Sequence, residues 1–252
     1  MEGLKSISHC VYMSADIVVK IIDVDHHSRL DRAIALAPHL PIGLTSPLLA
    51  SGFYQLGGRD LRYASYARMA VSTPRMGMSG VDPVTARLLA EQAVRWLNEL
   101  HGWTPADAAE QTLREPLDHG GFVGRAELIA QVEHFAALNR ERIVPHKLLD
   151  GLAAIAERAP SRARAVVPVH ADCHWGNWLA HDQSVTALLD FEWARFGELA
   201  DDWFFLTRFS GPHKETTLNA IVQATATPSD TLRAECGVSR SRPPHPRPLQ
   251  RT

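Results

Sequence analysis

The 252-residue chain is 45% hydrophobic and 21% charged, the composition of a globular protein that is long enough to bury a substantial core. Its net charge of -2 argues against nucleic acid or an anionic membrane as a partner. Three scattered cysteines argue against a disulfide framework, and no apolar run reaches the roughly 18 residues of a membrane helix, so we expect a cytoplasmic protein.

Two strands are predicted near the start of the chain. Residues 6–13 and 17–22 are rich in β-branched side chains and flank a short polar turn, a pattern typical of a hairpin. Lys20 interrupts the second, otherwise apolar strand, so its ammonium must reach solvent, a carboxylate or a ligand. Two interpretations stay open: a lysine that extends from an edge strand into water, or one that holds phosphate oxygens.

A small strand-rich unit and a larger helical unit are expected. A helix is predicted over residues 27–37, and strands are predicted over 44–52 and 61–69. Residues 71–80 have the composition of a linker, which divides the chain into an N-terminal unit, 1–70, and a C-terminal unit, 71–238. Residues 239–252 contain four arginines, four prolines and no acid, which predicts a disordered tail.

The C-terminal unit is predicted to be mainly helical. Asp82-Pro83 is a helix-start signal, and the apolar face that follows it continues to Trp103. Thr104-Pro105 repeats that signal for a shorter helix. Further helical patterns cover residues 125–139, 144–158, 203–208 and 215–227.

Acidic residues are concentrated between His101 and Glu133, where six acids stand against two arginines. These acids are Asp107, Glu110, Glu115, Asp118, Glu127 and Glu133. One interpretation is a solvated helical surface. The other is a locally negative field that attracts a cationic small molecule.

Polar residues follow two predicted strands of the C-terminal unit. The strand over residues 165–169 leads into His170, with Asp172 two residues further on and Asn177 five residues after that. A second apolar strand ends at Asp190. Two carboxylates and an amide can therefore gather at one corner, which is a common arrangement for loops that carry function.

This arrangement suits phosphoryl transfer, which requires mainly positioning and neutralisation of charge. Asp172 would accept or orient the proton of an acceptor hydroxyl. Asn177 and Asp190 would bind Mg²⁺, which prefers oxygen ligands and keeps several waters. Lys20 would hold the remaining phosphates, which explains a lysine in an apolar strand.

Two other interpretations stay open. His170, Asp172 and His174 alternate along one strand face and could bind zinc or iron, as in a metal-dependent hydrolase. That arrangement leaves Asn177 and Asp190 without a function. Alternatively, the polar side chains only satisfy the backbone groups of a tight turn.

The spacing His170-x-Asp172-(x4)-Asn177, followed by Asp190-Phe191-Glu192-Trp193, resembles the catalytic and metal-binding loops of the aminoglycoside phosphotransferase family. Gly197-Glu198-(x3)-Asp202 is similar to the motif that follows in that family, with Glu198 in place of an aspartate. The resemblance covers most of residues 5–220 and implies an α+β, two-lobed protein-kinase-like fold. Its N-terminal lobe would be small and β-rich, and its C-terminal lobe larger and mainly helical.

The resemblance also implies a function for each residue at the site. Asp172 would be the catalytic carboxylate, Asn177 and Asp190 the Mg²⁺ ligands, and His170 and Asp202 structural supports of the loop. The nucleotide, ATP or GTP, would contact Lys20, Ser8, Ala67 and Met69. Glu192, Trp193 and Glu198 would lie near the acceptor.

Two features depart from the family pattern. Only Met1 to Lys5 precede the first predicted strand, and no glycine-rich loop is present, so the nucleotide-binding lobe is expected to be incomplete. The acid that usually pairs with the phosphate lysine is missing from the next helix. Asp31 is the nearest acid, and Ala33 stands at the expected position.

We therefore expect an enzyme that moves the γ-phosphate of ATP or GTP to a hydroxyl of a small molecule. The resemblance and the acidic region together favour a cationic or polyhydroxylated acceptor, foremost an antibiotic of the aminoglycoside or basic peptide type. The alternatives are a catalytically inactive kinase-like protein that binds a nucleotide or another ligand, and the metal-dependent hydrolase described above.

Overall fold

The computed structural model describes residues 2–5, 10–24, 27–69, 71–117, 124–139, 143–162 and 167–240. Ser8, predicted to contact the nucleotide, and residues 241–252 of the predicted tail lie outside these ranges.

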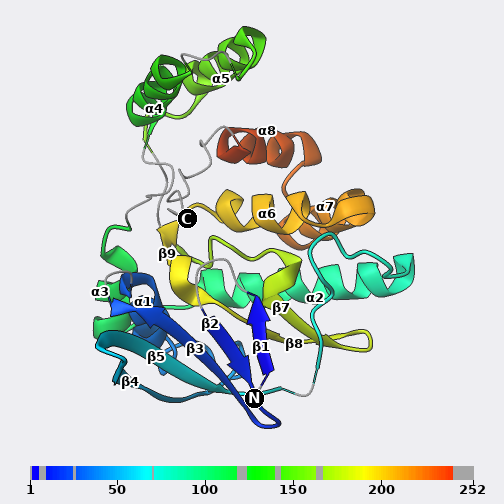
Figure 1. The fold of residues 1–252 in the computed structure, drawn as a ribbon. Coiled ribbons are helices and arrows are strands. Elements are labelled where there is room, and N and C mark those ends of the chain that lie inside the picture. Colours follow the sequence, from blue (N-terminus) through cyan, green and yellow to red (C-terminus); the bar gives the residue numbers. More distant parts are fainter. Residues whose placement is uncertain are drawn as a thin grey trace.

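An antiparallel five-stranded sheet forms the N-terminal part of the molecule (Figure 1), in the order β1-β2-β3-β5-β4. Its strands are β1 (Glu2–Lys5), β2 (Cys10–Met13), β3 (Ile17–Asp23), β4 (Leu48–Leu56) and β5 (Arg59–Ala67). The β-branched strand β3 lies at the centre, where Lys20 is opposite Val11 of β2 and Ala64 of β5. Lys20 is therefore not on an edge strand.

Strand β1 corrects one expectation from the sequence. Residues 2–5 were expected only to precede the first strand, but they form a strand that pairs with β2, Glu2 opposite Met13 and Lys5 opposite Cys10. This segment contains a glycine and no β-branched residue, so its own preference for a strand is weak. Backbone pairing to β2 determines its conformation.

Helices form most of the C-terminal part. They are α2 (Pro83–Gly102), α3 (Asp107–Arg114), α4 (Arg125–Leu138), α5 (His146–Arg158), α6 (Leu199–Arg208), α7 (Lys214–Thr225) and α8 (Ser229–Arg240). The Asp82 carboxylate caps α2 by accepting the backbone N–H groups of Val84 and Thr85, as expected from the start signal. Helix α8 had not been predicted, and it extends two residues into the tail predicted from residue 239.

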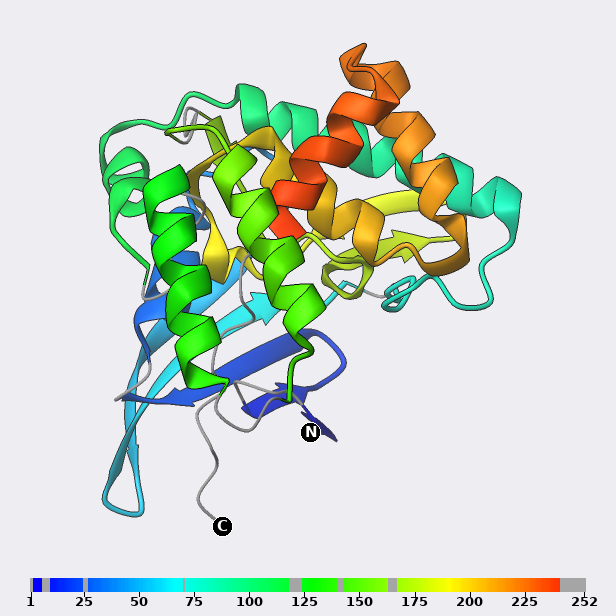
Figure 2. The same cartoon turned by 90° about the horizontal axis from the view of Figure 1, so that it is seen from above.

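The helices are arranged around α2 and α6. In the view from above (Figure 2), α7 lies along α2 and α8 crosses beside α6. The pair α4–α5 projects from the body (Figure 1) around a small core of its own, formed by Leu128, Val132, Ala156 and Ala159. Among the described helices, none combines the length and apolarity needed to cross a lipid bilayer.

Short strands and turns in the C-terminal part carry the candidate site. These elements are β6 (Val167–Val169), η2 (Trp175–Asn177), β7 (Trp178–His181), β8 (Ser184–Leu188), η3 (Phe191–Trp193), β9 (Arg195–Gly197) and η4 (Gly211–His213). Strand β6 pairs with β9, and β7 pairs with β8, both antiparallel. The two pairs place the loop after β6 beside the loop after β8.

Helix α1 (Ser28–Leu36) joins the two parts. Its residue Leu36 is fully buried and belongs to the same hydrophobic core as Leu97 of α2 and Trp175 of η2. The guanidinium of Arg32, also buried, donates to the carbonyl oxygens of Thr112 (2.5 Å), Ala194 (3.0 Å) and Glu115 (2.9 Å). One arginine thus connects α1 to the end of α3 and to the residue after η3.

Replacing Arg32 should therefore destabilise the protein. We expect Arg32→Ala to lower the free energy of unfolding by about 3 kcal/mol, because buried carbonyl groups lose their donors. Arg87→Ala on α2 is a suitable control, since its exposed ion pair with Glu91 should contribute less than about 0.5 kcal/mol. Denaturant titration measures both values, and equal losses in the two variants would contradict the assignment.

Candidate active site

A cleft with a volume of about 350 Å³ lies between the sheet and the C-terminal part. Its lining is mainly apolar, with Lys20, Arg68 and Asp190 as charged members. Ala67 and Met69, predicted to contact the nucleotide, line the same cleft at the connection between the two parts. The structure thus brings together the three nucleotide-contact residues that fall within its described ranges. The volume is within the range of sites that bind small molecules and cofactors.

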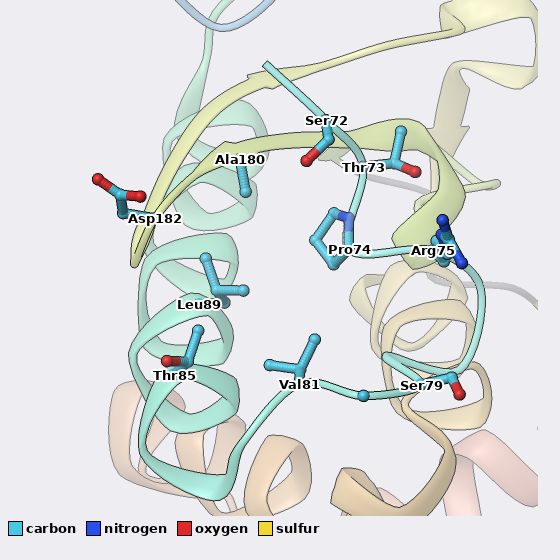
Figure 3. A pocket seen from close by; sticks show the side chains of 11 residues that line it. Ser72, Thr73, Pro74, Arg75, Ser79, Val81, Thr85, Leu89, Ala180 and Asp182 are labelled. Atoms are coloured by element: carbon cyan, nitrogen blue, oxygen red, sulfur yellow. The ribbon is translucent and has the colours of Figure 1, made fainter.

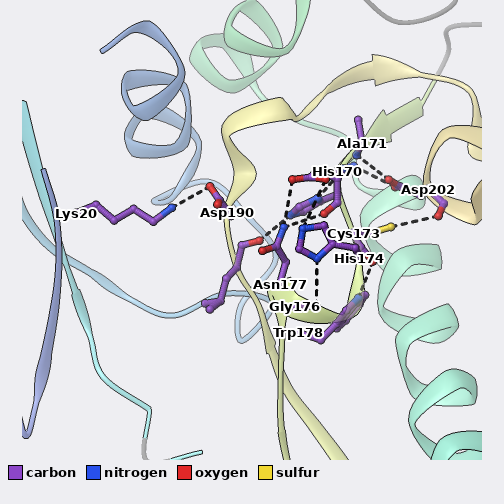
Figure 4. A network of polar contacts seen from close by, with 12 residues as sticks. Lys20, His170, Ala171, Cys173, His174, Gly176, Asn177, Trp178, Asp190 and Asp202 are labelled. Atoms are coloured by element: carbon purple, nitrogen blue, oxygen red, sulfur yellow. Dashed lines mark hydrogen bonds and ion pairs between the residues drawn. The ribbon is translucent and has the colours of Figure 1, made fainter. Parts of the chain in front are cut away.

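Lys20 connects the sheet to the C-terminal part (Figure 4). Its ammonium lies 2.9 Å from Oδ1 of Asp190 and 3.1 Å from Oε1 of Glu192. Burial alone would lower the pKa of Lys20, but the charges of Asp190 and Glu192 outweigh it and raise that pKa above its ordinary value. The lysine is therefore fully charged at neutral pH. Burial raises the pKa of Glu192, and Asp190 adds to the increase while Lys20 opposes it.

The loop after β6 is held by the carboxylate of Asp202 on α6. This fully buried group accepts the backbone N–H groups of His170 (3.0 Å) and Ala171 (2.7 Å) and contacts Nε2 of His101 at 2.9 Å. Ala171 has a φ of +61°, in the left-handed region that side chains other than glycine rarely adopt. The backbone bond to Asp202 stabilises that conformation. Burial opposes ionisation of Asp202, but its bond to His101 and neighbouring charges lower its pKa overall.

The buried ring of His170 connects the two loops of the site. Its Nδ1 accepts the backbone N–H of Asp172 (3.2 Å), and Nε2 lies 2.8 Å from the carbonyl oxygen of Leu189. These contacts require a neutral ring that carries its proton on Nε2. Burial correspondingly lowers the pKa of His170. The ring orients Asp172 and fixes the backbone immediately before Asp190.

Asp172 is partly buried beside Asn177. The amide nitrogen of Asn177 donates to the backbone oxygen of Asp172 (2.8 Å) and to its Oδ2 (3.4 Å). Burial raises the pKa of Asp172 to about 7, and the charge of Asp190 contributes to the increase. A carboxylate in these surroundings has the basicity to accept a proton near neutral pH.

Asn177 and Asp190 are brought next to each other by the backbone. The N–H of Leu189 donates to the carbonyl oxygen of Asn177 at 2.7 Å. Asp190 has φ 72° and ψ 58°, and this left-handed turn begins η3. The amide nitrogen of Asn177 makes the hydrogen bonds to Asp172, so those bonds do not use its amide oxygen. An amide oxygen and a carboxylate on adjacent loops form a donor set that fits Mg²⁺.

The three residues predicted near the acceptor lie in different surroundings. Glu192 is buried against Lys20. The ring of Trp193 packs under the guanidinium of Arg29 on α1, 4.7 Å from the ring centre. Glu198 is the half-buried residue that precedes α6.

The proposed zinc or iron arrangement has a specific obstacle. Both ring nitrogens of His170 are engaged with the backbone, and Nδ1 of His174 accepts the N–H of Gly176 at 3.1 Å. Within the described ranges, no cluster of three or more His, Cys, Asp or Glu side chains has the arrangement of a metal site.

A second hollow of about 230 Å³ lies on the C-terminal part (Figure 3), and Thr73 lines both this hollow and the cleft. It is formed where the segment from Ser72 to Val81 passes Thr85 and Leu89 of α2. None of the predicted site residues lines it.

His101 and Arg32 were not predicted as parts of the site or its support. His101 is the last buried residue of α2, where its ring packs edge-on against Trp203, 5.0 Å between ring centres. In the sequence, the position of His101 at the end of an apolar helix face was the signal that could have pointed to a buried role for this histidine. Its partner Asp202 is 101 residues away, so spacing could not reveal the pair.

Comparison with known proteins identifies the family. The sequence profile of the phosphotransferase enzyme family matches residues 17–235. A search among curated proteins gives no match.

Solved structures share the fold. The GDP complex of aminoglycoside 2'-phosphotransferase-IIIa has a TM-score of 0.71 at 16% identity, over 94% of this chain and 80% of that one. Macrolide 2'-phosphotransferase from Brachybacterium faecium has a TM-score of 0.62 at 20% identity, over 92% and 79%. An ADP-bound aminoglycoside phosphotransferase has a TM-score of 0.63 at 15% identity, over 94% and 80%. The two-lobed α+β fold expected from the sequence is confirmed, and the chain belongs to the phosphotransferase enzyme family.

Proposed function

We propose that this protein transfers the γ-phosphate of ATP or GTP to a hydroxyl group of a small molecule, foremost an antibiotic. The observation that carries this proposal is a series of contacts among four residues: Lys20 pairs with Asp190 in an apolar cleft, and Asn177 joins the backbone next to Asp190 to Asp172. The solved structures of similar fold include aminoglycoside phosphotransferases bound to GDP or ADP and a macrolide phosphotransferase without nucleotide, which supports the choice of donor and acceptor class. We propose a cytoplasmic location, as expected from the composition.

The nucleotide would lie in the cleft with its base between apolar side chains of both parts. Val11 and Val18 line the cleft from the sheet, and Leu179 and Leu189 line it from the C-terminal part. The backbone between Ala67 and Met69 would face the edge of the base. The ammonium of Lys20 would bind the α and β phosphates, which requires the full charge that its acidic neighbours maintain.

The acceptor hydroxyl would lie against Asp172. Its oxygen bonds to the γ-phosphorus while its proton passes to the Asp172 carboxylate, and the bond from that phosphorus to the bridging oxygen breaks to release a nucleoside diphosphate. Asn177 and Asp190 would hold Mg²⁺, which neutralises charge on the phosphates when bound. His170 and Asp202 would keep the Asp172 backbone in place.

A cationic or polyhydroxylated acceptor is supported by the acids of α3 and α4. Asp107 and Glu110 lie on α3, and Glu127 and Glu133 lie on α4. Acids that outnumber the arginines over residues 101–133 lower the local potential and attract cations. A screen of nucleotide consumption across aminoglycosides, macrolides, basic peptides and simple polyols, each with ATP and GTP, tests the acceptor class. Turnover only with anionic or apolar acceptors would contradict it.

A binding protein without turnover is the second candidate, because α1 presents Ala33 rather than an acid to the cleft. Such a protein would be stabilised against thermal unfolding by magnesium nucleotide, and no acceptor in the screen would become phosphorylated.

Removing the catalytic carboxylate should stop turnover without preventing nucleotide binding. We expect Asp172→Asn to reduce kcat by about 10³-fold, since the acceptor proton loses its base, while nucleotide affinity changes by less than about threefold. Asp182→Asn, in the exposed turn after β7, is the matched control and should retain wild-type turnover. Full activity of Asp172→Asn with a good acceptor would exclude Asp172 as the base.

Loss of a metal ligand should change the magnesium requirement. We expect Asn177→Ala to raise the Mg²⁺ concentration for half-maximal turnover by about tenfold or more, with part of the lost rate recovered at high Mg²⁺. Initial rates across a Mg²⁺ titration at saturating nucleotide measure this. An unchanged midpoint would show that Asn177 acts only through its hydrogen bonds to Asp172.

A further inference from the structure

The partner of the phosphate lysine is not where a kinase-like fold usually supplies it. In protein kinases an acid on the helix after the lysine strand pairs with the lysine and holds it in place. Here that helix is α1, whose single acid is Asp31. The Asp31 carboxylate instead contacts Nε of Arg62 at 2.6 Å and Nε2 of His27 at 3.3 Å.

The face of α1 that lines the cleft contains Ala33 and Ala37. Ala33 is almost fully buried, so this part of the helix already contacts other residues and exposes no acid to Lys20. A charged lysine with only 17% of its side chain exposed needs a carboxylate nearby to offset the loss of water. The compensating charge must come from another element.

Helix η3 supplies that carboxylate. The left-handed turn at Asp190 sends the chain into η3, and Glu192 follows with its Oε1 3.1 Å from the Lys20 ammonium. Only 4% of the Glu192 side chain is exposed. Glu192 therefore approaches the lysine from the C-terminal part, not from α1.

Contacts between α1 and η3 fix the position of Glu192. The two elements pack against each other, and Arg32 of α1 donates to the carbonyl oxygen of Ala194, directly after η3, at 3.0 Å. The neighbouring Phe191 ring is buried and packs edge-on against His170, 4.7 Å between ring centres. Glu192 is thus held on both sides by buried contacts.

Asp190 has a second task in the proposed reaction, because it would also bind Mg²⁺. A carboxylate shared with a metal ion has less charge to offer the lysine. Glu192, at the same ammonium, can continue to hold Lys20 when Asp190 turns toward the metal. We propose that Glu192 is the positioning residue that holds Lys20 for the nucleotide phosphates, in place of an acid on α1. This inference rests on the proposed phosphotransfer function.

A double-mutant cycle separates this function from others. The proteins are wild type, Glu192→Gln, Lys20→Ala and the double variant, with kcat/KM for the nucleotide and nucleotide affinity measured for each. Glu192→Gln alone should lower kcat/KM by about tenfold, since it keeps the size of the side chain but loses its charge. In the Lys20→Ala background, Glu192→Gln should lower kcat/KM by less than about twofold, because the lysine that Glu192 positions is already absent.

Controls distinguish the competing explanations. Asp31→Asn on α1 should retain wild-type kcat/KM within about twofold, and thermal unfolding should show that every variant folds. Two results would overturn the inference by showing that Glu192 acts independently of Lys20. One is a tenfold loss of kcat/KM from Glu192→Gln in both the wild-type and the Lys20→Ala backgrounds. The other is a rise, caused by Glu192→Gln in the Lys20→Ala background, in the Mg²⁺ concentration for half-maximal turnover. If the wild-type protein binds nucleotide but transfers no phosphate, the proposed function is refuted instead. The double-mutant cycle measured on nucleotide affinity would then still test the pairing of Glu192 with Lys20.

Discussion

The geometry of the site depends on the fully buried carboxylate of Asp202. Asp202 is fully buried on α6, and its two oxygens accept the backbone N–H groups of His170 and Ala171 while His101 contacts it from α2. A buried charge is costly unless hydrogen bonds replace its water, and here strained backbone and a histidine supply them. The same bonds that solvate Asp202 hold the chain in its left-handed turn at Ala171, directly before Asp172. One interaction therefore contributes both to stability and to the geometry of the candidate site.

A second constraint fixes the two parts of the chain relative to each other, because the cleft residues come from both parts. Lys20 belongs to the sheet, whereas Asp190 and Glu192 follow β8. Helix α1 packs against η3, and the three carbonyl contacts of Arg32 connect α1 to the C-terminal part. The lysine is thus placed relative to Asp190 by direct ion pairs and by a helix that has little freedom to move.

The sequence was most informative where chemistry restricts residue type and spacing. The loop from His170 to Asn177 and the carboxylate at Asp190 were recognised as a candidate site because the proposed proton transfer and magnesium binding admit few types of side chain. Strand β1 could not be found, because residues 2–5 have weak strand preference and pair only once β2 is in place. The contact between Lys20 and Glu192 joins residues 172 positions apart, so only the folded chain could show it. Through this contact Lys20 has a carboxylate partner although α1 supplies none.

The hydrophobic core has a consequence for how the protein unfolds. Leu36, Leu40 and Leu44 of the N-terminal part share one apolar cluster with Leu97, Trp203 and Ile221 of the C-terminal part. Pulling the lobes apart would expose that cluster to water, so the two lobes are expected to melt as one cooperative unit. The α4–α5 hairpin has its own small core and can open earlier, before the remainder of the molecule loses structure.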